Sequence, residues 1–188
     1  MSKQYRFWYS FDRTYYDDIY EYAVDSNYLI TTDEAAELGI PRVELAKLAQ
    51  RGRLEHLSHG LYRLARYVPS DSDPYAIAVK ATGPGAYLIG ESVIALLQLA
   101  PTNPEYICVA TPRRMRRSLP PTIRVKQDKE PSDTAIYSGV PCQVAAEAIR
   151  ECAKTMLPER LEAAARKALD EGYITRREFE LLEEQVKW

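Results

Sequence analysis

The chain opens with an amphipathic segment. Between residues 13 and 26, apolar side chains recur at positions i, i+3, i+4 and i+7, namely Tyr16, Ile19, Tyr20 and Ala23. This spacing places them on one face of an α-helix. We therefore expect a first helix here, with its apolar face turned toward a core or toward a partner protein.

Two further helices follow, separated by a short turn. Thr31 and Glu34 have the spacing of a capping box, which predicts a helix that begins beside them. Gly39 ends that helix, and Pro41 begins another helix that runs to Arg51. Two helices joined by a tight turn that contains glycine are typical of a helix-turn-helix motif.

Two short strand-like pieces come next, at residues 53–57 and 61–64, and they are joined through Ser58, His59 and Gly60. This pattern predicts a β-hairpin. The order of helix, helix, turn, helix and hairpin is that of a winged helix-turn-helix domain, in which the hairpin is the wing.

The third helix is one-sided. Ile40, Leu45, Leu48 and Ala49 form its apolar stripe. The side chains left to face outward are Arg42, Lys47, Gln50 and Arg51. Such a face suits a recognition helix in a DNA major groove, because arginine and glutamine make bidentate contacts with guanine and adenine edges.

The predicted wing carries Arg53, His59 and Arg63, which we expect to contact phosphates. Glu44 lies on the same face as the basic residues of the third helix and argues against DNA contact. The alternative is a helical domain with a basic surface that binds another protein.

Residues 69–74 are polar and bounded by prolines, which indicates a domain boundary. We predict an N-terminal domain at residues 1–68, with an aromatic arm and the winged helix-turn-helix, and a C-terminal α+β domain at residues 75–188. In the latter we expect a helix or strand at 75–81, a helix over 86–100, and strands at 106–110, 123–126 and 134–137. Helices should then follow from Pro141 to the end. The fold class is therefore α+β.

Charge is unevenly distributed. The chain has 25 basic and 27 acidic residues, yet residues 75–127 hold seven basic and two acidic ones, a net charge of +5. The strongest basic feature there consists of Arg113, Arg114, Arg116 and Arg117. We expect it to contact the DNA backbone or an acidic surface of a partner protein. The alternative is a solvated loop between two strands.

No common catalytic signature occurs. The chain lacks P-loop, dinucleotide-binding, HExxH and GxSxG motifs, and its histidines are limited to His56 and His59. Its three cysteines are widely spaced. We expect no catalytic residues, no cofactor and no metal. The enzymatic alternative is a nuclease that uses Glu91, Asp128 and Glu130. Without an apolar span or a leader peptide, the protein is expected to be cytoplasmic.

The residues resemble those of a known family. The runs Ile30–Pro41, Gln50–Leu54 and His59–Leu64, followed by Gly85–Leu99 and Val109–Arg114, are similar to the AbiEi family of antitoxins over roughly residues 20–160. The resemblance implies a bacterial antitoxin that neutralises a nucleotidyltransferase-like toxin and represses its own operon. It also implies that the protein binds operator DNA, which we expect to involve two copies on an inverted repeat.

Carried onto this sequence, the resemblance places DNA-facing positions at Arg42, Lys47 and Arg51 and in the wing from Arg53 to Arg63. The alternative from the regulator class is a stand-alone winged-helix transcription factor without a toxin partner.

Overall fold

The structure of the protein is a computed structural model, and it describes residues 13–115, 118–131 and 133–186. The chain divides into two compact units, Met1–Pro69 and Ser70–Trp188. Half of the ten aromatic residues that make the N-terminal arm of the sequence prediction lie outside the described residues, namely Tyr5, Phe7, Trp8, Tyr9 and Phe11.

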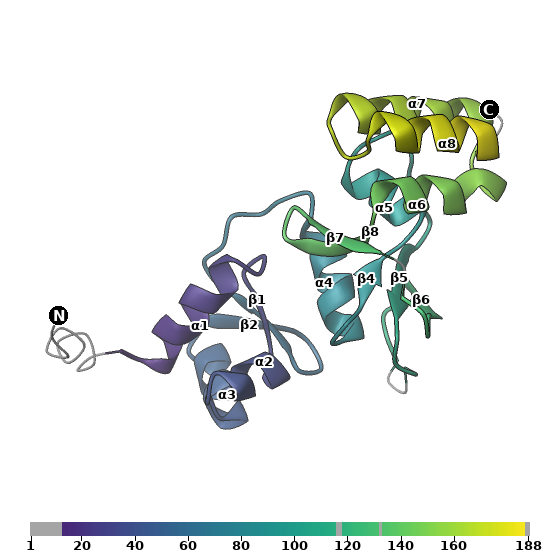
Figure 1. The fold of residues 1–188 in the computed structure, drawn as a ribbon. Coiled ribbons are helices and arrows are strands. Elements are labelled where there is room, and N and C mark those ends of the chain that lie inside the picture. The colour runs from purple at the N-terminus through teal and green to yellow at the C-terminus, as the bar shows by residue number, and fades with distance from the viewer. Residues whose placement is uncertain (1–12, 116–117, 132, 187–188) are drawn as a thin grey trace, which may run out of the picture. The chain divides into compact units, whose positions relative to one another are not determined.

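In its described residues, the first unit has three helices and a small antiparallel sheet (Figure 1). The helices are α1 (Tyr15–Val24), α2 (Thr32–Glu37) and α3 (Arg42–Gln50), and the strands are β1 (Leu29–Thr31), β2 (Leu54–Ser58) and β3 (Leu61–Leu64). In the sheet β3 is central, with β1 and β2 on either side of it. The strand β1 was not expected from the sequence.

A single core holds the first unit together. Ile19 and Ala23 of α1 lie in this core with Leu45 of α3 and with Leu54 and Leu64 of the sheet, and each is at most 3% exposed. Of the apolar face predicted for α1, Ile19 and Ala23 are buried and Tyr16 packs partly buried against them, but Tyr20 is 48% exposed and was wrongly placed on this face. Since each buried aliphatic side chain stabilises the folded state by about 1.5–3 kcal/mol, these contacts fix the three helices on the sheet.

The second unit has a five-stranded mixed sheet in the order β6-β5-β4-β8-β7. Its strands are β4 (Tyr87–Leu88), β5 (Ile107–Thr111), β6 (Ile123–Gln127), β7 (Thr134–Tyr137) and β8 (Val140–Gln143). β5 pairs with β6 in parallel and with β4 antiparallel, while β8 pairs in parallel with β4 and antiparallel with β7. The described residues are thus mixed α and β in both units.

The second unit also contains helices, some of which pack against this sheet (Figure 1). α4 (Asp73–Thr82) packs against β4, β5 and β8. α5 (Glu91–Leu96), α6 (Ala145–Glu151) and the short 3₁₀ helix η2 (Cys152–Lys154) connect the sheet to α7 (Pro158–Asp170) and α8 (Arg176–Val186). The last two helices form an antiparallel hairpin whose facing side chains include Leu161, Phe179 and Leu182, all buried.

Two sequence expectations for this unit are wrong. Residues 86–100 are not one helix, because the chain forms β4, turns at Gly90 with φ +54° and only then enters α5. The chain also does not become helical at Pro141, which is a residue of β8. Residues 86–100 are mostly apolar and buried, so they carry no alternation that separates a strand from a helix. β8 is a four-residue strand that forms by pairing with β4 and β7, which no local pattern indicates.

Candidate nucleic-acid interface

The turn between α2 and α3 is fixed by local hydrogen bonds. At the start of α2 the amide of Glu34 donates to Thr31 Oγ1 at 3.2 Å, and the amide of Thr31 donates to Glu34 Oε2 at 2.8 Å. At its end Gly39 adopts φ +76°, which lets the amide of Ile40 donate to the carbonyl of Ala35 at 2.8 Å. These bonds set the direction in which α3 begins.

α3 presents one face to the core and one to solvent. Leu45 is fully buried, and Leu48 and Ala49 pack partly buried against the same core. The opposite face is exposed and consists of Arg42, Val43, Ala46, Lys47 and Gln50. Val43, at 57% exposure, is an apolar side chain among these polar ones. The helix thus has an outward surface formed mostly by long polar side chains.

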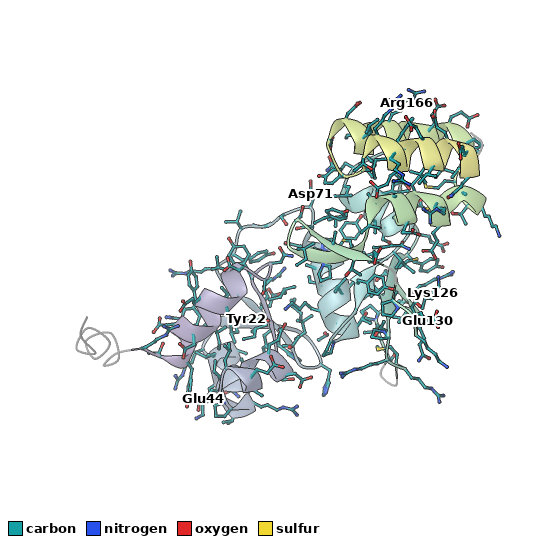
Figure 2. All side chains as sticks on the ribbon, viewed as in Figure 1. Tyr22, Glu44, Asp71, Lys126, Glu130 and Arg166 are labelled. Atoms are coloured by element: carbon teal, nitrogen blue, oxygen red, sulfur yellow. The ribbon has the colours of Figure 1, made fainter. Side chains whose placement is uncertain are left out.

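Two of the basic residues on α3 have carboxylate partners. Lys47 Nζ donates to Glu44 Oε1 at 2.7 Å, and Arg42 lies 3.5 Å from Asp33 across an open surface. The Arg42 side chain is 74% exposed, so this second contact is weak. Figure 2 shows Glu44 on α3. The carboxylate that argued against DNA contact is therefore engaged by the neighbouring lysine.

Gln50 and Arg51 end this surface. Both side chains are exposed, and within the described parts of the chain neither has a hydrogen bond or an ion pair. Arg51 directly follows α3, and its backbone amide donates to the carbonyl of Lys47 at 3.0 Å. The helix therefore fixes the backbone at Arg51, while the Arg51 guanidinium is available to bind a ligand.

Arg53 and Arg63 lie in a different setting. The guanidinium carbon of Arg53 is 4.1 Å from the ring centre of Tyr16 in α1. Arg63 donates two hydrogen bonds to Glu55, at 2.6 and 3.1 Å, and its guanidinium carbon is 4.0 Å from the ring centre of Tyr67. The Arg63 side chain is only 15% exposed. Both arginines are held by contacts within the first unit.

The strand register also places Arg63 on the sheet face that is turned away from α3. Leu64 pairs with Leu54, and both lie in the core that α3 contacts. Arg63 is the neighbour of Leu64 in the same strand, so its side chain points to the opposite face. Arg63 and the outward side chains of α3 therefore belong to different surfaces of this unit.

The tip of the hairpin is held against the beginning of α2. The amide of Thr32 donates to the carbonyl of Gly60 at 2.9 Å. Gly60 has φ +71°, and a Cβ at this position would lie 2.9 Å from Thr32 Oγ1, so a larger residue does not fit without a shift. His59, next to Gly60, is exposed. The hairpin tip thus presents His59 from a fixed backbone.

The arginine cluster belongs to the second unit, in the connection from β5 to β6. Arg113 and Arg114 are exposed, and the described residues provide no hydrogen bond or ion pair to either side chain. Arg116 and Arg117 lie outside the described residues. Sequence reasoning did not single out two further cations on β6, where Arg124 lies over the ring of Tyr106 and Lys126 Nζ donates to Glu151 at 2.9 Å. Their alternation along one strand was the available signal.

The carboxylates of the nuclease alternative have separate local partners. Glu91 accepts a hydrogen bond from Thr102, while Asp128 accepts from the Tyr87 hydroxyl at 3.1 Å and from the amide of Glu130 at 3.2 Å. Figure 2 shows Glu130 near β6. In the portion of the chain that the structure describes, no three histidine, cysteine, aspartate or glutamate side chains are grouped so that they could hold a metal.

The cysteines do not form a nucleophilic centre either. Cys142 and Cys152 are buried, and burial raises the pKa of each thiol to about 12. Burial also raises the pKa of Cys108. All three are therefore protonated thiols at neutral pH. Among the described residues, no helix is both long enough and apolar enough to cross a membrane.

Comparison with known proteins finds a family match within the first unit. Residues 17–65, from α1 to the end of β3, match the model of a family described as a transcriptional regulator, AbiEi antitoxin. The resemblance read from the sequence is confirmed over this range. The family is one of regulators and not a class of enzymes.

Two other comparisons complete this result. No curated protein matches the chain. Among solved structures, the crystal structure of the RV2827C protein from Mycobacterium tuberculosis is similar at 16% identity, covering 89% of this chain and 80% of that chain, with a TM-score of 0.39.

Proposed function

We propose that this protein is a transcriptional regulator that binds operator DNA through its first unit and serves as the antitoxin of a nucleotidyltransferase-like toxin. In this proposal the first unit is a winged helix-turn-helix domain. α3 is the recognition helix, and the hairpin of β2 and β3 is the wing. The family match of residues 17–65 supports the regulator and antitoxin class.

The observation that carries the proposal is the exposed polar face of α3. Its buried face is fixed by Leu45, and its outward face ends in Gln50 and Arg51, two side chains whose hydrogen-bonding groups suit the edges of adenine and guanine. Lys47 and Arg42 lie on the same face, where they would contact phosphates or bases after releasing their surface carboxylate partners. A rigid helix with such a surface fits a major groove.

The wing contributes unequally in this proposal. His59 at the exposed tip is the wing residue best placed to reach a phosphate. Arg53 and Arg63 would first have to leave Tyr16 and Glu55, and Arg63 faces away from α3. We therefore assign these two arginines a smaller part in DNA binding than the sequence alone indicated.

The arginine cluster of the second unit would supply further phosphate contacts. Arg113 and Arg114 are exposed in the described residues, and in the sequence Arg116 and Arg117 follow them after Met115. If all four meet phosphates, replacing them together with glutamine lowers the magnitude of the log-log salt slope of operator binding by up to about four. An unchanged slope would remove the cluster from the DNA interface and leave an acidic partner protein as its target.

The test of DNA binding is a titration of the full chain with two labelled duplexes of equal length, one from upstream of its own gene and one with that sequence scrambled. Fluorescence anisotropy should give a clearly lower dissociation constant for the upstream duplex. Arg166→Ala in α7 is a matched control, because Arg166 is an exposed arginine bound to Glu162 and should not affect binding. Equal affinity for both duplexes would contradict a sequence-reading regulator.

A stand-alone regulator is a second candidate, because the family match covers the DNA-facing unit and extends no further than residue 65. Co-expression with the neighbouring gene separates the two. An antitoxin restores growth to cells that are arrested by the neighbouring gene product, whereas a stand-alone regulator does not. A variant without the first unit's DNA contacts should retain this rescue if the second unit neutralises the toxin.

A further inference from the structure

The two edges of the five-stranded sheet differ in how they are protected. β6 forms one edge and carries Arg124 and Lys126 on its exposed side. β7 forms the other edge and reads Thr-Ala-Ile-Tyr, without a charge or a proline. Charged side chains on an edge strand discourage pairing with another strand, whereas a neutral edge permits it. Only the β6 edge has this protection.

The side chains of β7 strengthen the contrast. Ile136 is 74% exposed, the highest value among the large apolar side chains that the structure describes. Its neighbour on the same sheet face, Thr134, is also exposed. A β-branched aliphatic side chain gains free energy when it is covered by a paired strand, since each Å² of apolar surface removed from water contributes about 25 cal/mol.

The hairpin register shows which backbone groups of β7 point away from β8. Ser138 and Gly139 form a two-residue turn with positive φ at both positions, so Tyr137 and Val140 are the closing hydrogen-bonded pair. By alternation, Ala135 also bonds to β8, while Ile136 and Thr134 do not. In this register Ile136 lies opposite Pro141, which has no amide to donate. This agrees with a position at which the two strands exchange no hydrogen bonds.

The outward groups are therefore the amides and carbonyls of Thr134 and Ile136. Within the described residues these four groups have no hydrogen-bond partner. The inner side of the strand is firmly held, because the amide of Val144 also donates to the carbonyl of Asp133 at 3.0 Å. β7 is thus a rigid edge with an open hydrogen-bonding row.

We infer that β7 pairs antiparallel with β7 of a second copy of this chain, which joins two sheets across a two-fold axis. In this register Thr134 of one copy and Ile136 of the other form a hydrogen-bonded pair with two hydrogen bonds. The two-fold axis generates a second such pair, so the two copies share four hydrogen bonds. Ala135 lies opposite its own copy at the non-hydrogen-bonded position, where side chains approach most closely and a small residue fits.

Charge and shape favour a second copy as the occupant. In the sequence the charged residue next to the strand is Asp133, and the register places it opposite Tyr137 of the other copy, so the two Asp133 side chains do not face each other. Each outward group finds its complement in the same four-residue sequence, as an isologous contact requires. The contact is short, and we therefore expect a dissociation constant in the micromolar range.

The primary test is sedimentation equilibrium of the full chain without DNA, from about 1 to about 200 µM. The wild-type chain should dimerise over this range. Ile136→Lys places cations beside the axis and should weaken the dimer at least about tenfold. Leu157→Lys is the control, since Leu157 is 60% exposed elsewhere in the same unit and should leave the dimer unchanged.

Thr134→Pro gives a second variant that leaves the contacts with β8 intact. It removes one outward amide but no bond to β8, because Thr134 occupies a non-hydrogen-bonded position against Gln143. It should also weaken the dimer while the melting temperature of the chain stays close to the wild-type value. A wild-type chain that remains monomeric up to the highest concentration would overturn the inference, as would a dimer that both variants leave intact.

Cross-linking checks the register. Ala135→Cys places two thiols opposite each other at a Cα separation of about 4.5 Å, which a disulfide can span. Mild oxidation should therefore give a covalent dimer in which the wild-type cysteines do not participate. Val125→Cys on the β6 edge is the matched control and should stay monomeric. Absence of the Ala135→Cys dimer would show that β7 meets a strand of another protein or none.

Discussion

Two sets of side chains that the sequence assigned to DNA contact in the first unit differ in what holds them. Gln50 and Arg51 end α3 with side chains that are exposed and unengaged among the described residues. Arg53 and Arg63, only a few residues further on, stack on Tyr16 and Tyr67, and Arg63 also pairs with Glu55. Positive charge in the sequence therefore does not identify a DNA contact by itself. The contacts that a cation already makes decide how readily it binds a phosphate or a base.

The largest effect on stability should come from a substitution in the packing that positions α3. Leu45→Ala removes a fully buried side chain and should lower the unfolding free energy of the first unit by about 2–5 kcal/mol. Operator binding should fall with it. Val43→Ala on the exposed face of the same helix should change stability by less than about 0.5 kcal/mol. Thermal unfolding followed by circular dichroism measures both, and similar losses would contradict the assigned orientation of α3.

Comparing Arg51→Ala with Arg53→Ala tests whether the exposed and the engaged side chains differ in DNA binding. If Arg51 contacts a base, its removal weakens operator binding by about 1–3 kcal/mol and affects unrelated DNA less. Arg53→Ala should instead lower the unfolding free energy by about 0.5–1 kcal/mol, through loss of the contact with Tyr16, and leave operator affinity within experimental error. Anisotropy titrations with matched and scrambled duplexes would refute the distinction if both variants lost the same affinity.

Glu44→Gln should have the smallest effect of these substitutions, and it should strengthen operator binding. It frees Lys47 from its carboxylate partner at 2.7 Å and removes an anion from the outward face of α3. Operator binding should tighten, and the salt slope should steepen by up to about one. The comparison with Glu37→Gln, an acidic residue of α2, controls for the change in net charge. Weaker binding by the Glu44 variant would place α3 outside the interface.

The first unit could be predicted largely from local patterns. The capping box at Thr31, the glycine at position 39 and the apolar spacing of α1 each act over a few residues, and the structure has helices where they indicate them. The strand Leu61–Leu64 has the expected bounds. β1 was missed because it has three residues, and it becomes a strand only by pairing with β3.

The second unit was harder to predict, because its elements depend on distant partners. Leu88 pairs with Val109 on one side and with Cys142 on the other, and no local signal reveals either contact. Gly90 bends the chain within an apolar stretch that otherwise favours a continuous helix. The engagement of Arg63 by Glu55 and Tyr67 was likewise invisible, since it follows from the register of β2 against β3 and not from spacing along the chain.

Site-specific photocrosslinking to operator DNA tests whether α3 is the DNA-reading surface. A photoreactive amino acid is placed at Gln50 in one sample and at Arg63 in another, and each is irradiated with the labelled upstream duplex. If α3 reads the DNA, a crosslink should form from position 50 and little or none from position 63. Crosslinking from position 63 without crosslinking from position 50 would contradict the assignment of α3 as the DNA-reading surface.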